Sequence, residues 1–123
     1  AEGGIAVALA ECCILDPGRR RGAWVDLRDA VDVDAPWPAL LFGESQARVL
    51  VTTPPDAGAA LVARARAAAL PCTRIGEVRP EADGLRIAGP GPELHLALGA
   101  LANAYFDAIP RRMEPQARSG RAA

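Results

Sequence analysis

The first stretch of the chain has apolar side chains at the spacing of a helix. Between positions 5 and 15, Ile5, Leu9 and Cys12 recur at intervals of three or four residues, and most positions between them are also apolar. We therefore expect a helix that is buried on several sides. The Asp-Pro-Gly sequence of residues 16–18 is expected to end it.

Two further helices are predicted downstream. Asp56 is expected to be the N-cap of the first, whose apolar stripe begins at Leu61 and Val62. The second begins near Leu98, and its apolar face is expected to reach Ile109.

Short runs between these helices alternate or are rich in β-branched residues, which is typical of strands. Asp83 and Gly84 form a hairpin signal, so the strands on either side of them are expected to pair directly. Residues 28–38 are acidic, contain proline and are expected to form mainly loop. The predicted strands cover residues 23–27, 48–53, 72–79, 85–88 and 93–97.

This order of elements predicts an α+β fold, a mixed β-sheet with helices packed mainly on one face. The predicted domain covers residues 1–113, and the polar, unpatterned residues 114–123 are expected to be a disordered tail. The first helix starts so close to position 1 that no residues remain to cap it. We therefore expect a fragment that is truncated at its N-terminus.

Composition excludes several classes of function. The 123 residues suffice for one domain, and 14 basic against 15 acidic residues leave no basic surface for a nucleic acid. The chain has no lysine, which removes Schiff-base and P-loop lysine chemistry. The apolar run of residues 5–15 is shorter than the roughly 20 residues that span a membrane. Three cysteines without a disulfide or zinc spacing favour the reducing cytoplasm.

A polar triplet directly after an apolar run is the main candidate site. Glu44, Ser45 and Gln46 follow Gly43, which permits a positive φ. In one interpretation they only complete a turn. In the other they form the lip of a cleft, where Glu44 and Gln46 bind sugar hydroxyls or an amide and Ser45 donates to a phosphate.

A glycine pair at the start of the first helix is a second candidate. The backbone N–H groups near Gly3 and Gly4 could hold a phosphate, although Glu2 would repel it. The alternative is that the small residues permit close packing on a neighbouring domain. Arg48 could pair with Glu44 or reach a phosphate, or it could be an exposed arginine of a strand.

No other residue type forms a catalytic or metal-binding constellation. His95, the only histidine, alternates outward and is expected to be a surface residue. The cysteines lie in apolar surroundings and are expected to be inert packing residues. We assign no catalytic residue and no metal ligand.

Four stretches of sequence carry a family resemblance. They are residues 2–11 (EGGIAVALAE), 41–51 (LFGESQARVLV), 74–78 (RIGEV) and 108–113 (AIPRRM). The first two together resemble the C-terminal domain of the AIR-synthase-like superfamily. FGESQ followed by Arg48, the RIGEV stretch and the AIPRRM ending resemble the formylglycinamidine synthases specifically. The FGESQ form and the Arg-Met ending are similar to the terminal domain of their second half. One departure is Ala-Glu before the glycine pair, where the family usually has Ser-Asp.

The resemblance implies an ATP-dependent C–N amidoligase of purine biosynthesis. Such an enzyme converts formylglycinamide ribonucleotide, ATP and glutamine or ammonia to the amidine. ATP and Mg²⁺ would be its cofactors, and its partners would be the N-terminal domains of the same synthase and a glutaminase subunit or domain. This lobe would supply one wall of a cleft through Glu44, Ser45 and Gln46 and be inactive alone.

Two alternatives stay open. The lobe could be non-catalytic and serve only as a structural element or bind an auxiliary nucleotide. It could also belong to another superfamily member, such as selenophosphate synthetase or AIR synthetase.

Overall fold

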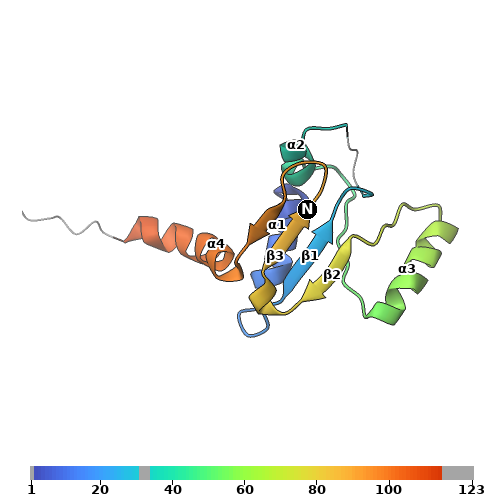
Figure 1. Ribbon diagram of the computed structural model, residues 1–123. Coiled ribbons are helices and arrows are strands. Elements are labelled where there is room, and N and C mark those ends of the chain that lie inside the picture. The colour runs from blue at the N-terminus through green and yellow to red at the C-terminus, as the bar shows by residue number, and fades with distance from the viewer. Residues whose placement is uncertain (1, 31–33, 115–123) are drawn as a thin grey trace, which may run out of the picture.

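The computed structural model describes residues 2–30 and 34–114 of the chain. Helices and strands are interspersed, and four strands form one mixed sheet (Figure 1). The α+β class is therefore confirmed. The elements are α1 (Gly4–Ile14), β1 (Gly22–Asp26), α2 (Trp37–Phe42), α3 (Pro55–Ala67), β2 (Gly76–Arg79), the 3-10 turn η1 (Glu81–Asp83), β3 (Leu85–Ala88), β4 (Leu94–Leu96) and α4 (Leu98–Met113).

The strand order in the sheet is β2-β1-β3-β4. β1 runs antiparallel to β2 and parallel to β3, and β3 runs antiparallel to β4. The register places Ala23 of β1 between Val78 of β2 and Leu85 of β3. β2 and β3 therefore flank β1, and the direct hairpin predicted through Asp83 and Gly84 is wrong.

The connection from β2 to β3 passes around the first residue of β1. A Cβ atom on Gly22 would lie 2.5 Å from the carbonyl oxygen of Gly84 and 2.6 Å from that of Pro80. Gly84 itself has a φ of +70°, a conformation that glycine adopts without strain. Glycine at these two positions lets the chain cross the end of β1, which no local pattern of the sequence reveals.

The core lies between α1 and the sheet. α1 is apolar on most sides because it packs against β1, β3, α2 and α4. The largest fully buried side chains are Ile14, Leu27, Leu85 and Ile87. The other buried apolar residues are Ala6, Leu9, Cys13, Val25, Leu40, Leu41, Leu98 and Ala102.

Residues 48–53, predicted as a strand, have no regular secondary structure and lie outside the four-stranded sheet. Leu50 packs against the core, whereas Val49 is 82% exposed and Val51 is 56% exposed. The alternation in the sequence is real, but it places one side chain in the core and forms no backbone ladder. The strand predicted for residues 72–79 is also shorter, since β2 comprises only its second half.

Two helices begin beside prolines rather than at polar caps. α2 forms where the sequence predicts a loop followed by an apolar run, with Pro36 as its N-cap residue. α3 begins at Pro55, and Pro54 is its N-cap residue. Asp56 therefore lies in the first turn and is not the N-cap. The fixed φ of proline suits a first helical turn, where its missing N–H costs little.

α3 and the second half of α4 stand apart from the core. No residue of α3 is buried, and Figure 1 shows this helix beyond β2, at the edge of the sheet. In α4, Leu98 and Ala102 are buried, but Tyr105 and Ile109 are 49% and 70% exposed. For α3, packing on the same face of the sheet as α1 stays a prediction.

The predicted tail of residues 114–123 falls almost entirely outside the described residues, of which Glu114 is the last. The boundary of the domain at residue 113 stays a prediction. Within residues 2–30 and 34–114, no helix is both long and apolar enough to cross a membrane.

Candidate functional site

The start of α1 touches the end of α2 through the backbone. Gly3 and Gly4 have φ values of 77° and 82°. A Cβ atom on Gly4 would lie 2.5 Å from the Cα atom of Phe42 and 2.6 Å from the carbonyl oxygen of Leu41. Close packing is thus one role of the glycine pair. The partner in this contact is α2 of the same chain, whereas the sequence led us to expect a neighbouring domain.

Glu44 follows α2 with one residue between them, and its side chain reaches the start of α1. The backbone N–H of Gly3 donates a hydrogen bond of 2.7 Å to Oε1 of Glu44. Gly3 is the N-cap residue of α1, which has no side-chain cap and no acidic residue in its first turn. The structure therefore brings together three of the predicted site residues, Gly3, Gly4 and Glu44.

This contact is a long-range form of the capping box. In a capping box, a glutamate three residues into a helix accepts from the backbone N–H of the N-cap residue. In α1 that third position is Ala6, which has no acceptor in its side chain. The acceptor for the N–H of Gly3 is instead Glu44, 41 residues away in the sequence. A carboxylate is favourable here because the helix dipole places partial positive charge at this end. A phosphate on the N–H of Gly3 would have to displace it.

In the turn around Glu44, the residue with a positive φ is Ala47 and not Gly43, which the sequence led us to expect. Gly43 has a φ of −68°, so its glycine is not needed for a positive φ. It is needed because a Cβ atom there would lie 2.3 Å from the carbonyl oxygen of Ala39. Ala47 takes the left-handed conformation instead, with a φ of 60°. Such strain costs about 1 kcal/mol or more and clusters at ligand sites and switch regions.

Ser45 and Gln46 are both exposed on this turn. Arg48 follows them and is half-buried, contrary to the exposed strand arginine of the sequence interpretation. Its Nη1 atom is buried and has no hydrogen-bond partner in the described chain. Buried guanidinium groups are rarely left unpaired, so this donor of Arg48 lacks the partner that such groups normally have, as do Arg20 Nε and Trp24 Nε1.

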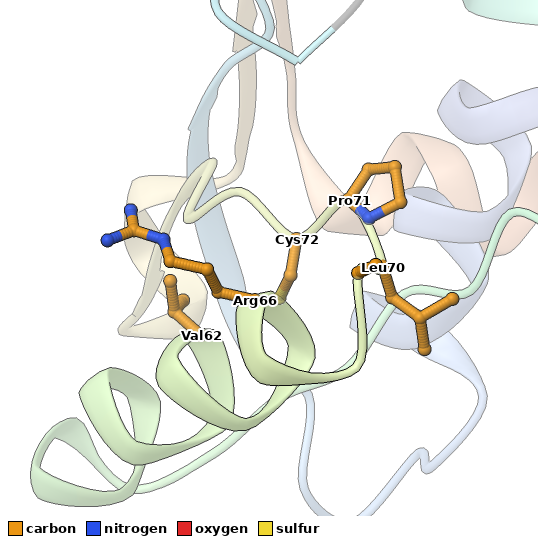
Figure 2. A pocket seen from close by; sticks show the side chains of 6 residues that line it. Val62, Arg66, Leu70, Pro71 and Cys72 are labelled. Atoms are coloured by element: carbon orange, nitrogen blue, oxygen red, sulfur yellow. The ribbon is translucent and has the colours of Figure 1, made fainter.

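Two hollows of the described surface lie away from the loop of residues 44–48. One, of about 330 Å³, lies between the last turns of α3 and the segment that follows this helix, which includes Leu70 and Cys72 (Figure 2). The other, of about 340 Å³, is an apolar groove between α1, β3, β4 and α4, with Phe42 at its border. The loop lines neither hollow. Ser45 and Gln46 are exposed on the turn and border neither of these two hollows.

The histidine and the cysteines lie outside this loop. His95 is exposed on β4, as predicted, and its Nε2 atom lies 3.0 Å from the carbonyl oxygen of Asp83. Burial raises the pKa of the Cys13 thiol to about 11, which keeps it protonated and inert near neutral pH. Cys12 is exposed, contrary to the packing role expected of it. Across residues 2–30 and 34–114, no group of three His, Cys, Asp or Glu side chains could hold a metal ion.

Residues 1–87 match the family described as AIR synthase related protein, C-terminal domain. The chain belongs to this family. Within this AIR synthase related C-terminal domain, the match includes both the start of α1 and the loop of residues 44–48. The contact between Gly3 and Glu44 thus lies in the part that the family shares. β4 and α4 follow the matched range.

Curated relatives of this C-terminal domain are named phosphoribosylformylglycinamidine synthase subunit PurL. That of Anaeromyxobacter sp. (strain Fw109-5) is 36% identical over 89% of the chain. That of Chlorobium luteolum is 36% identical over 88% of the chain, and that of Thermosynechococcus vestitus is 37% identical over 92%. The chain spans only 14% or 15% of the length of these relatives. No solved structure matches the chain.

Sequence reasoning missed three features of the site in this AIR synthase related domain. They are the bond between Glu44 and Gly3, the left-handed Ala47 and the unpaired Nη1 atom of Arg48. A side-chain cap normally lies within a few residues of the helix it caps, so nothing near residue 3 pointed to residue 44. The missing polar cap of α1 was the only available signal.

Proposed function

We propose that the chain is the C-terminal lobe of a phosphoribosylformylglycinamidine synthase. The full-length protein converts formylglycinamide ribonucleotide, ATP and glutamine or ammonia to the amidine in de novo purine biosynthesis. The observation that carries this proposal is the 36% identity to a PurL subunit over 89% of the chain. The FGESQ form of residues 42–46, followed by Arg48, adds support.

Ser45, Gln46 and Arg48 are the side chains proposed to face the ligand. The first two are exposed on a strained turn, and the third has a buried donor without a partner. A hydroxyl and an amide both donate and accept hydrogen bonds, and a guanidinium pairs with phosphate. A ribonucleotide with a phosphate, sugar hydroxyls and an amide matches this set of groups.

ATP and Mg²⁺ are proposed for the full-length enzyme. The described residues of this lobe do not fit a metal site, since they contain no cluster of metal ligands. We therefore assign the Mg²⁺ ligands and the catalytic groups to other parts of the protein. The contribution of this lobe is to hold the nucleotide in a fixed orientation, which lowers the entropic cost of the reaction.

The proposed partners follow from the length of the relatives. Because the chain spans 14% of the Anaeromyxobacter subunit, the second wall of the cleft is assigned to N-terminal domains of the same synthase. A glutaminase subunit or domain would supply ammonia. The proposed location is the cytoplasm.

The proposal is tested in the full-length protein with ammonia as the nitrogen source. We expect ATP-dependent amidine formation, and none from the isolated 123 residues. The double variant Ser45→Ala/Gln46→Ala should lower kcat/KM for the nucleotide by about tenfold to a hundredfold, because two hydrogen bonds to a ligand are lost. Its melting temperature should match that of the parent.

Thr73→Ala serves as the matched control, since Thr73 is an exposed polar residue of another loop. It should leave both kcat/KM and melting unchanged. A parent without amidine synthase activity would contradict the proposed function. Full activity of the double variant with a lowered melting temperature would instead indicate a structural lobe or one that faces a pseudo-equivalent site.

A further inference from the structure

We propose that Glu44 is a positioning residue, which holds the loop of residues 44–48 against α1 so that Ser45 and Gln46 face the ligand. This inference rests on the proposed function and deepens it. It changes the role of Glu44 from a ligand-binding group, as its sequence context predicts, to the anchor of the ligand-binding loop.

The geometry gives Glu44 a partner within the domain. Its Oε1 atom accepts the 2.7 Å hydrogen bond from the N–H of Gly3. By contrast, Ser45, Gln46 and the Arg48 side chain form no hydrogen bond within the described chain. The four polar residues of the loop thus divide into one whose side chain forms a hydrogen bond and three whose side chains form none within the described chain, of which Ser45 and Gln46 are exposed.

Both ends of the loop are fixed, and Glu44 completes this arrangement. Before the loop, Gly43 lies so close to Ala39 that even a Cβ atom would collide with its carbonyl oxygen. After the loop, Leu50 packs against the core. Between these points Ala47 is held at a φ of 60°. A strained residue persists only where its surroundings fix it, and among the described side chains of the loop Glu44 is the one that forms a hydrogen bond, to Gly3 of α1.

The anchor requires an oxygen acceptor at the end of the side chain more than it requires charge. Glutamine keeps this acceptor and the length of the side chain, whereas alanine removes the acceptor. A group that bound the ligand through its negative charge would not tolerate glutamine. The comparison of Glu44→Ala with Glu44→Gln therefore separates an anchor from a charged ligand-binding group.

Glu2→Ala is the matched control. Glu2 is an exposed carboxylate beside the same helix end and has no hydrogen bond in the described chain. Its removal changes the local charge without breaking the contact to Gly3.

The experiment measures two quantities in the full-length protein: hydrogen exchange in a peptide that covers the start of α1, and KM and kcat for formylglycinamide ribonucleotide. For Glu44→Ala we expect exchange and KM each to rise roughly fivefold to tenfold, the effect of one lost helix cap, with a smaller change in kcat. Glu44→Gln should return both values to within about threefold of the parent, and Glu2→Ala should match the parent.

Several results would overturn the proposal. One is a Glu44→Gln variant as impaired in KM as Glu44→Ala while exchange in α1 stays at the parental rate in both, since the carboxylate would then act on the ligand. Another is a Glu44→Ala variant with parental exchange and KM. If the parent lacks amidine synthase activity, the proposed function fails, and the exchange rates alone still decide whether Glu44 anchors the loop.

Discussion

Glu44 and Asp26 both serve as anchors for backbone N–H groups, as Asp16 does for Gly18 after α1. Glu44 accepts from Gly3 at the start of α1. At the end of β1, Asp26 accepts from the backbone N–H of Arg28 at 3.1 Å and from its Nε atom at 3.0 Å. In both cases the carboxylate satisfies a donor that secondary structure leaves unpaired. Glu44, which the sequence pattern marks as a candidate ligand-binding group, thus has a structural contact within the domain.

Arg28→Ala should raise the pKa of Asp26. The side-chain hydrogen bond from Arg28, helped by its backbone N–H, lowers the pKa of Asp26 from 3.8 to about 2. The variant keeps the backbone bond, so the pKa should return only part of the way. NMR titration of the Asp26 carboxyl carbon measures this change, with Arg21→Ala as an exposed control. A pKa that stays near 2 would show that Arg28 is not the cause.

The same pair predicts how stability depends on pH. Because the pKa of Asp26 is lower in the folded state, its contribution is fully present above 3.8 and is lost as the pH falls through about 2. The melting temperatures of the parent and Arg28→Ala should therefore differ at neutral pH and converge in acid. Since both side chains are exposed, the difference should also shrink at high salt.

The helices and strands depend on the periodicity of apolar side chains and on close contacts between distant backbone segments. The sequence shows only the first of these. Side-chain patterns predicted α1, β1, β3, β4 and α4 because each has apolar residues at its own period. The crossing of β1 at Gly22 and the contact of α1 with α2 at Gly4 depend instead on how closely two distant backbones approach. Glycine marks such a place in the sequence but does not name its partner.

Gly4→Ala and Gly99→Ala should have opposite effects on stability. At Gly4 a Cβ atom meets the backbone of α2 at 2.5 Å, and the φ is +82°. We expect this variant to lose about 2–5 kcal/mol of unfolding free energy through overpacking and left-handed strain. At Gly99, in α4, nothing lies within 4 Å, so alanine should add about 0.5–1 kcal/mol.

Urea unfolding of the two glycine variants in parallel measures both changes. Equal losses would contradict the close approach of α1 and α2. A gain in stability for Gly4→Ala would do the same, whereas a neutral Gly99→Ala would concern only α4.

The described chain as a whole leaves much apolar surface uncovered. Phe42 and Val78 are each 55% exposed, Ile109 is 70% exposed and Met113 is 77% exposed. Large exposed apolar areas mark surfaces that contact other parts of a protein. This supports the proposal that the lobe works against other domains of a longer synthase, which would also close the cleft beside Ser45 and Gln46.

The sequence predicted the location of a candidate site, but it did not predict the contacts within it. The polar triplet and its place after an apolar run marked the loop as that candidate. The separate roles that we propose for Glu44 and its neighbours depend on a hydrogen bond between residues 41 positions apart. Such a contact follows from the placement of α1 beside α2, which no single segment of the chain encodes.

The most direct test of a ligand site in this lobe is hydrogen exchange of residues 42–48 in the full-length protein, with and without formylglycinamide ribonucleotide. We predict that the nucleotide slows exchange in this loop, because Ser45, Gln46 and Arg48 then bind it. Protection elsewhere in the protein with unchanged exchange in residues 42–48 would contradict the account. The lobe would then support the enzyme without lining its substrate cleft.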